Sequence, residues 1–204
     1  DAWEPNPSGT LISFQLSRGG IERGELTIRS VDTGDNVDGP INGVRYSPVM
    51  WVDDDAFYYI REAAPDGPGA FRRRGVWYHR VGSPVSADAL VFEPDQRRAT
   101  VLNVQLDHGR WLIITEGYGT GNRNELWIAD LNRDAPDRPH LTPIQRDVDA
   151  ETRAAASRDG YLYLLTTAGA PRRQLCHTSC DQPGIEHWTT LVAEDAHSNS
   201  PTSP

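Results

Sequence analysis

The stretch Asp107-His108-Gly109-Arg110-Trp111-Leu112-Ile113-Ile114 decides the fold class, because a turn signal leads directly into four consecutive apolar residues. Asp and Gly are among the residues that tight turns prefer. The apolar run does not alternate with polar residues, which is typical of a strand that is buried on both faces. This stretch therefore predicts a turn followed by a strand that lies between two packed layers.

Turn signals that precede an apolar strand recur along the chain, at Pro7-Ser8-Gly9, Asp53-Asp54-Asp55, Asp107-His108-Gly109 and Arg158-Asp159-Gly160. The steps from Ser8 to Asp54, from Asp54 to His108 and from His108 to Asp159 are 46, 54 and 51 residues. An interval of about 50 residues is the length of one four-stranded propeller blade. The spacing therefore favours a radial arrangement of small antiparallel sheets.

Short apolar stretches rich in β-branched and aromatic residues predict the strands, and none of them has the period of a helix. They are Leu11–Leu16, Glu25–Val31, Ala56–Arg61, Gly75–Val81, Ala99–Leu106, Trp111–Glu116, Glu125–Leu131, Tyr161–Thr167 and Trp188–Val192, with a weaker strand near Leu141 to Gln145. The chain is therefore predicted to be all-β.

These observations predict a partial β-propeller in residues 1–195, with about three complete four-stranded antiparallel blades and an incomplete first blade. The polar, proline-containing residues 196–204 are expected to be disordered. Two alternatives stay open. A β-sandwich also has turns at short intervals, and a ring of four blades could close on itself.

Composition excludes several classes of function. The net charge is −9, from 29 acidic residues against 20 basic residues that are all Arg, so a nucleic-acid partner is not expected. No apolar run approaches the length of a bilayer span, and a membrane partner is not expected either. The first residues show no secretory signal. We expect a cytoplasmic location, with export left open.

Five stretches, in this order, resemble the propeller domain of the prolyl oligopeptidase family: Trp51–Tyr58, Val76–Gly82, Arg110–Gly117, Asn122–Leu131 and Glu186–Glu194. In that family a seven-bladed propeller caps an α/β-hydrolase domain with a Ser-Asp-His triad, and the enzyme cleaves short peptides after proline. The resemblance implies that this chain is a substrate-gating part of such a propeller. Its implied partners are the α/β-hydrolase domain and short peptide substrates.

The resemblance also implies three substrate-binding residues. Phe57 matches a phenylalanine that faces the cavity, Thr115 stands where well-known members have a substrate-contacting arginine, and Tyr118 stands where they have a cysteine. Replacing Arg by Thr removes a bidentate donor. The alternative for Phe57 and Tyr118 is packing between blades, and Thr115 could simply end its strand.

Catalysis is not expected from this chain alone. No Gly-x-Ser-x-Gly segment occurs, so no serine is presented on a nucleophile elbow. We predict no catalytic residue, no cofactor and no metal site. The alternative function is that of a self-contained small propeller that binds a ligand or a protein through its channel or loops.

Four further motifs have functional and structural interpretations. Val31-Asp32-Thr33-Gly34 is a triplet that aspartic peptidases use, but one copy in a turn favours the turn. Cys176, His177, Cys180 and His187 could bind zinc, although adjacent strand residues point to opposite faces. Asp53-Asp54-Asp55 offers oxygen ligands for Ca²⁺ but is interpreted as a polar turn, because it lacks the spacing of a known calcium loop. Arg72-Arg73-Arg74 is interpreted as a solvated loop or as a contact to the hydrolase domain or to an acidic substrate.

Overall fold

The computed structural model describes residues 2–17, 24–44, 47–63, 73–94, 100–118 and 121–195. These residues form sixteen β-strands and two short 3-10 helices, Val85–Ala87 and Ile185–His187, so the all-β prediction is confirmed. Within these ranges no helix is both long and apolar enough to span a bilayer. Arg72 and the predicted tail, 196–204, lie outside the described residues.

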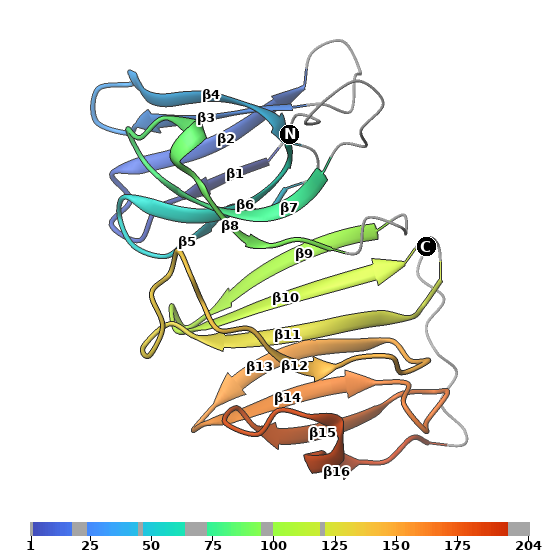
Figure 1. The fold of residues 1–204 in the computed structure, drawn as a ribbon. Coiled ribbons are helices and arrows are strands. Elements are labelled where there is room, and N and C mark those ends of the chain that lie inside the picture. Colours follow the sequence, from blue (N-terminus) through green and yellow to red (C-terminus); the bar gives the residue numbers. More distant parts are fainter. Residues whose placement is uncertain are drawn as a thin grey trace.

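The strands form one eight-stranded and two four-stranded antiparallel sheets, and the eight-stranded sheet divides into two units, so that there are four successive blades, which we call blades 1 to 4 (Figure 1). Blade 1 contains β1 (Ala2–Pro5), β2 (Leu11–Ser17), β3 (Gly24–Ser30) and β4 (Asn36–Val44). Blade 2 contains β5 (Met50–Trp51), β6 (Ala56–Ala63), β7 (Arg73–Arg80) and β8 (Ala89–Phe92). Among the described residues blades 1 and 2 share one backbone pairing, between Val44 and Arg61, so we treat them as separate layers.

The second half of the chain repeats the same arrangement. Blade 3 contains β9 (Thr100–Asp107), β10 (Trp111–Tyr118), β11 (Asn124–Asp130) and β12 (Thr142–Gln145). Blade 4 contains β13 (Thr152–Arg158), β14 (Tyr161–Thr166), β15 (Gln174–Ser179) and β16 (Thr189–Val192). Neighbours in sequence pair with each other in both sheets, as short hairpin connections require.

All four predicted turns connect the first strand of a blade to its second strand. In blades 3 and 4 both central residues of this turn are left-handed, with φ of 51° at His108 and 67° at Gly109, and 52° at Asp159 and 79° at Gly160. Such turns match the twist of the two strands that they join. The spacing of about 50 residues is thus the spacing of equivalent hairpins in successive blades.

Three apolar cores lie between successive blades, because the second strand of a blade buries both of its faces. In β6, Phe57 and Tyr59 pack toward blade 1, while Tyr58 and Ile60 pack toward blade 3. In β10, Leu112 and Ile114 pack toward blade 2, and Trp111 and Ile113 toward blade 4. This explains why these strands are apolar without alternation.

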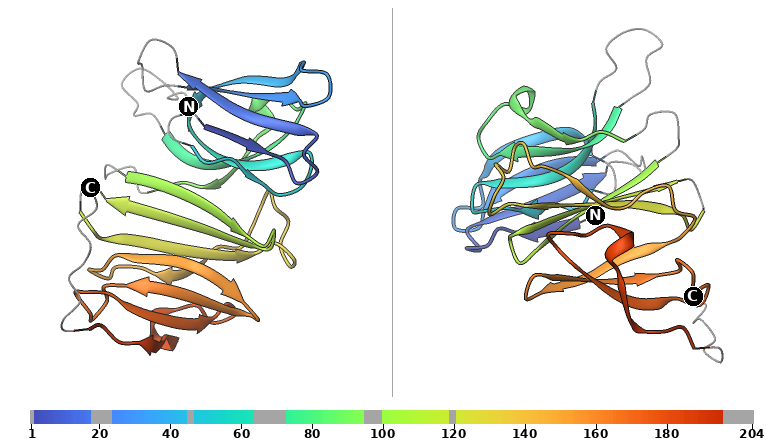
Figure 2. Two further views of the ribbon diagram at one scale, coloured as in Figure 1. Left: turned by 180° about the vertical axis from the view of Figure 1, so that it is seen from behind. Right: turned by 60° about the horizontal axis from the view of Figure 1, so that its bottom comes forward.

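The blades form an open fan. Figures 1 and 2 place blade 1 and blade 4 at opposite ends of the stack, and no described strand of blade 4 pairs with blade 1. The partial propeller is confirmed, and neither a two-sheet sandwich nor a closed four-bladed ring matches this arrangement.

One detail of the prediction differs from the structure: blade 1 has four strands. Its first strand, β1, pairs with β2 from Ala2–Gln15 to Pro5–Ile12. This strand has only four residues, all of them exposed, and it includes a proline. Neither alternation nor an apolar run marks it in the sequence.

Candidate functional site

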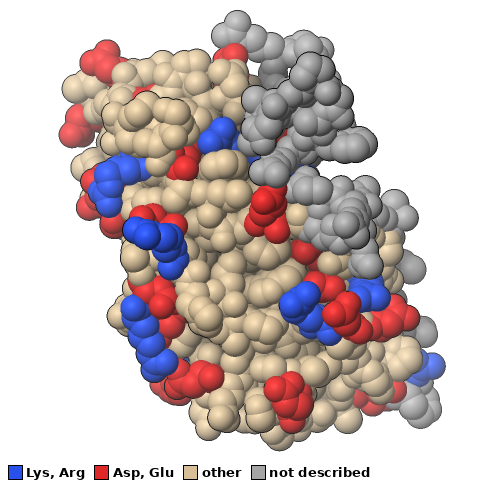
Figure 3. Space-filling model, in the orientation of Figure 1, with Lys and Arg blue, Asp and Glu red and all other residues tan. Residues whose placement is uncertain are grey.

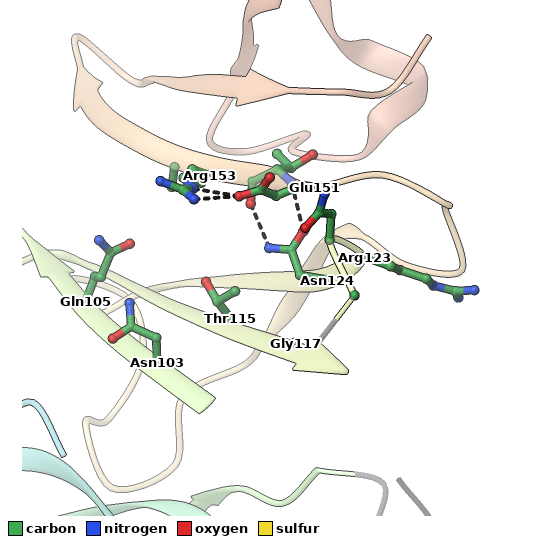
Figure 4. Close-up of a pocket in the computed structure, with 12 residues that line it drawn as sticks. Asn103, Gln105, Thr115, Gly117, Arg123, Asn124, Glu151 and Arg153 are labelled. Atoms are coloured by element: carbon green, nitrogen blue, oxygen red, sulfur yellow. Dashed lines mark hydrogen bonds and ion pairs between the residues drawn. The ribbon is translucent and has the colours of Figure 1, made fainter. Parts of the chain in front are cut away.

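A polar cavity of about 450 Å³ lies between blades 3 and 4. One wall comes from β9 and β10, the other from the start of β13, and the segment before β11 closes one end (Figure 4). Its lining includes Asn103, Gln105, Thr115, Asn124, Glu151 and Arg153.

Strand register explains why the β9–β10 wall is polar. Ile113 packs toward blade 4, and Thr115, two residues later, lies on the same face of the sheet. Asn103 pairs with Thr115 and Gln105 pairs with Ile113, so these amides share that face. Leu102 and Val104, on the opposite face, are buried against blade 2. The innermost strand of blade 3 thus buries its apolar residues on one side and presents amides to the cavity on the other.

A buried hydrogen-bond cluster holds the two walls together. Asn124 Nδ2 donates to the Thr152 carbonyl at 2.7 Å, and the Thr152 amide donates to Asn124 Oδ1 at 2.8 Å. Gln145 Nε2 donates to the Asn124 carbonyl at 2.8 Å, and Thr152 Oγ1 donates to Gln145 Oε1 at 2.6 Å. A polar cluster with its partners in place rigidifies its surroundings, so the relative position of blades 3 and 4 is fixed at this end of the cavity.

The charged residues of the lining are Arg123, Glu151 and Arg153. Arg153 Nη2 lies 2.6 Å from Glu151 Oε1, and Arg173 Nη2 lies 3.1 Å from Glu151 Oε2. Burial alone would raise the pKa of Glu151, but the hydrogen bonds from Arg153 and Arg173 outweigh it and lower that pKa. Arg123 Nη2 lies 3.3 Å from the Asp147 carboxylate, outside the lining.

The structure separates the three residues that the resemblance singled out. Thr115 lines the cavity, and Tyr118 ends the same strand. Phe57 lies in the core between blades 1 and 2, with 0% of its surface exposed, and its ring centroid is 5.0 Å from that of Trp51. This location is the one that packing between blades requires. Contact with substrate stays a prediction for all three residues.

Sequence reasoning missed most of this cavity. Asn103 and Gln105 stand on a predicted strand, and their alternation with Leu102 and Val104 is the signal that could have placed them on one face. Glu151 directly precedes β13 and Arg153 lies within it, and β13 has no comparable signal.

The structure places the remaining sequence motifs in a turn, in the core between blades or in a ring contact. Asp32 lies in the turn between β3 and β4, which ends at Gly34 with φ of 74°. Cys176 and Cys180 are free and buried in the core between blades 3 and 4, while His177 stacks on Tyr161 at 5.1 Å. Among the described residues no three His, Cys, Asp or Glu side chains are grouped to hold a metal ion.

Asp53, Asp54 and Asp55 form the polar turn between β5 and β6. The Asp53 side chain accepts the Asp55 amide at 3.0 Å, and Asp54 Oδ1 accepts the Ser8 amide at 2.8 Å. Arg80 pairs with Asp55 at 2.7 Å. Arg73 and Arg74 are the first two residues of β7. On the face shown in Figure 3, acidic and basic residues are interspersed.

The fold and the cavity define this chain as successive blades of a propeller with a polar inner wall. The family model described as the prolyl oligopeptidase N-terminal beta-propeller domain matches residues 1–201. The chain therefore belongs to this family and is a propeller domain of the prolyl oligopeptidase type.

Relatives and solved structures agree with this assignment. The chain is 28% identical to a prolyl endopeptidase from Elizabethkingia meningoseptica, over 93% of this chain and 27% of that protein. A structure from a study of two prolyl endopeptidases has a TM-score of 0.81 at 24% identity, covering 96% of this chain and 28% of the other. Prolyl oligopeptidase B from Galerina marginata, bound to a 35-residue substrate, has a TM-score of 0.81 at 18% identity, covering 95% and 29%. The chain thus spans about a quarter of the length of these proteins.

Proposed function

We propose that this chain is the substrate-gating part of a serine peptidase that cleaves short peptides after proline, and that it works with an α/β-hydrolase domain. Family membership over residues 1–201 carries the proposal. A propeller cap of this kind excludes water and large folded proteins, which favours electrostatic stabilisation at a reacting centre. The chain itself then contributes a wall and no reacting group.

The polar cavity between blades 3 and 4 is the part of that wall that we propose contacts peptide. Amide and hydroxyl side chains can both donate and accept hydrogen bonds, as a peptide backbone requires. Thr115, which lines the cavity, is the proposed contact there. Tyr118, three residues later on the same strand, lies on the opposite face of β10, so its proposed contact with peptide would be outside this cavity. Phe57 has the least support of the three candidates, because it lies in the core between blades 1 and 2 and does not line this cavity.

Two measurements test this function. The 204-residue chain should not hydrolyse a chromogenic prolyl peptide, and the NMR signal of Thr115 should shift when acetyl-Ala-Pro-Ala-amide is added. Hydrolysis that a serine-reactive inhibitor blocks would show that the chain has a nucleophile of its own. Peptide that leaves the Thr115 signal unchanged would contradict a peptide-facing wall.

The alternative, a self-contained propeller that binds through its channel, has less support. A self-contained ring needs its first and last blades in contact, and blades 1 and 4 lie at opposite ends of the stack (Figure 2). A coding frame that continues into a Gly-x-Ser-x-Gly segment would support the peptidase, because that segment positions the nucleophile.

A further inference from the structure

Glu151 and Arg153, on one wall of the cavity between blades 3 and 4, belong to a charge group that also includes Arg173, which lies outside the lining. Glu151 is shared by two guanidinium groups, those of Arg153 and Arg173, so this group carries one uncompensated positive charge. The chain as a whole has a net charge of −9. A local positive site on an acidic protein favours the approach of a single negative charge.

Arg153 keeps free hydrogen-bonding capacity. Its Nε and Nη2 atoms lie 2.9 Å and 2.6 Å from one oxygen of Glu151. A guanidinium has five N–H donors, so three remain after these two contacts. The side chain is 66% exposed and lies on the wall of the cavity that faces Gln105 (Figure 4). Its contact with Glu151 also shows that a carboxylate fits against this guanidinium.

The opposite wall offers neutral donors. Within the described part of the chain, no hydrogen bond occupies the side chains of Asn103, Gln105 or Thr115, all of which line the cavity. Each of the two amides carries an NH₂ group, and the hydroxyl can also donate. A ligand oxygen bound by Arg153 would therefore also meet the donors of the opposite wall. The uncharged part of the same ligand could donate hydrogen bonds to the side-chain carbonyl oxygens of Asn103 and Gln105.

We propose that this cavity recognises a peptide carboxylate, with Arg153 as the cation that binds it and Asn103 and Gln105 as additional donors. The proposal deepens the proposed function and rests on it, because the ligand is taken to be a peptide. The carboxylate can belong to an acidic side chain or to a peptide C-terminus, and both present the same pair of oxygens to the guanidinium.

NMR titration of the 204-residue chain tests the proposal, read on the side-chain amide signals of Asn103 and Gln105. Acetyl-Ala-Glu-Ala-amide is compared with acetyl-Ala-Gln-Ala-amide, which differs only in charge. Acetyl-Ala-Gln-Ala with a free C-terminus tests the second source of the carboxylate. We expect each charged peptide to bind about tenfold more tightly than the neutral one, as a charge-assisted hydrogen bond predicts. The proposal requires that at least one of the two charged peptides binds more tightly than the neutral peptide.

The variant Arg153→Gln should abolish that preference. Arg158→Gln is the matched control, because Arg158 lies on the same strand, is 81% exposed and is not part of the cavity. Equal binding of charged and neutral peptides, or equal loss in both variants, would overturn the carboxylate site. Acetate that binds as tightly as the charged peptides would overturn it too, since the site would then recognise a small anion only.

The outcomes separate this inference from the proposed function. If neutral and charged peptides shift the Thr115 signal alike, the carboxylate site is wrong while a peptide-facing wall stands. If no peptide shifts any signal of the cavity, both are wrong.

Discussion

His79 is fully buried between two carboxylates from different parts of the fold. Its Nδ1 lies 2.6 Å from Asp88 Oδ1, next to β8, and its Nε2 lies 3.0 Å from Asp38 Oδ2, on β4 of blade 1. Tyr59 donates to the other oxygen of Asp88, and Arg61 lies 3.6 Å from that oxygen. A neutral imidazole has one N–H, so only the protonated ring can donate to both carboxylates.

This geometry predicts a pH-dependent contribution to stability. Burial lowers the pKa of His79, but the hydrogen bonds to Asp88 and Asp38 outweigh it, and the net pKa is raised. The stabilisation is therefore complete below the ordinary histidine pKa of about 6.5 and is lost as pH rises through the raised value. We expect the free energy of unfolding to fall by about 1–3 kcal/mol over this range, the size of a hydrogen bond to a charged group.

Urea unfolding of the wild type and of His79→Gln between pH 6 and pH 9 measures this effect. The two stabilities should converge as pH rises. His108→Gln is the control, because His108 is exposed and its variant should follow the wild type. Parallel curves for His79→Gln and the wild type would contradict a charged His79.

Phe57 and Thr115 should differ in what they contribute. Phe57→Ala removes a buried ring and should cost about 3–5 kcal/mol of unfolding free energy. Thr115→Ala changes a partly exposed position and should cost about 0.5 kcal/mol or less, while weakening peptide binding. Urea unfolding and peptide titration of both variants check this. A stable Phe57→Ala that loses peptide binding would instead assign Phe57 to the substrate.

At the scale of strands, the side chain of Asn124 links blade 3 to blade 4 because it pairs with the Thr152 backbone as a neighbouring strand would. This side chain makes both hydrogen bonds to the Thr152 backbone and is buried. Asn124→Ala leaves both backbone groups unpaired and should destabilise the chain by about 2–6 kcal/mol, at about 1–3 kcal/mol for each unpaired group. Asn122→Ala, at an exposed position nearby, should be neutral. Equal unfolding midpoints for the two variants would contradict a role for Asn124 between the blades.

The sequence predicted the second strand of every blade, for a physical reason, but β15, the third strand of blade 4, is absent from the predicted strands. β6, β10 and β14 lie in the middle of their sheets, and their apolar residues fill the cores between blades. β13 reads Thr-Arg-Ala-Ala-Ala-Ser-Arg and has no apolar side chain larger than alanine, so it lacks the apolar signal of those strands. Thr115 could therefore be placed on a predicted strand, whereas Arg153 could not, and the choice of Thr115 as a site residue came from the family resemblance.

β4 was missed for another reason, which is its glycines. Gly43 has a φ of 83°, and a Cβ atom there would lie 2.7 Å from the Glu62 carbonyl oxygen. Glycine is needed because the backbone of β4 approaches β6 closely, near the single pairing of blades 1 and 2. Glycine in a sequence indicates a turn. The glycines of β4 therefore did not predict a strand, although Gly43 is required by the close contact with β6.

At the scale of the whole molecule, the two end blades differ from the middle blades in having one face without a neighbouring blade. On β2, Ser13 and Gln15 are buried toward blade 2, so Phe14 and Leu16 lie on the outer face, and Leu16 is 52% exposed. On β14, Leu162 and Leu164 pack toward blade 3, which leaves Tyr161 and Leu165 on the outer face. Tyr161 is 45% exposed. Faces of this kind are covered by another blade elsewhere in the fan.

The 204-residue chain should therefore self-associate, since two copies can cover these outer faces and the edges of end sheets also tend to pair. Sedimentation velocity at several protein concentrations should show a concentration-dependent increase in mass. Leu16→Glu and Leu165→Glu, separately, should raise the monomer fraction, because a charge within an apolar contact is costly to bury. Val101→Glu is the control: Val101 is 58% exposed, close to the 52% of Leu16, but lies on the inner strand of blade 3, away from both outer faces. A monomer at all concentrations, or the same effect from all three variants, would show that the outer faces of blades 1 and 4 do not drive self-association.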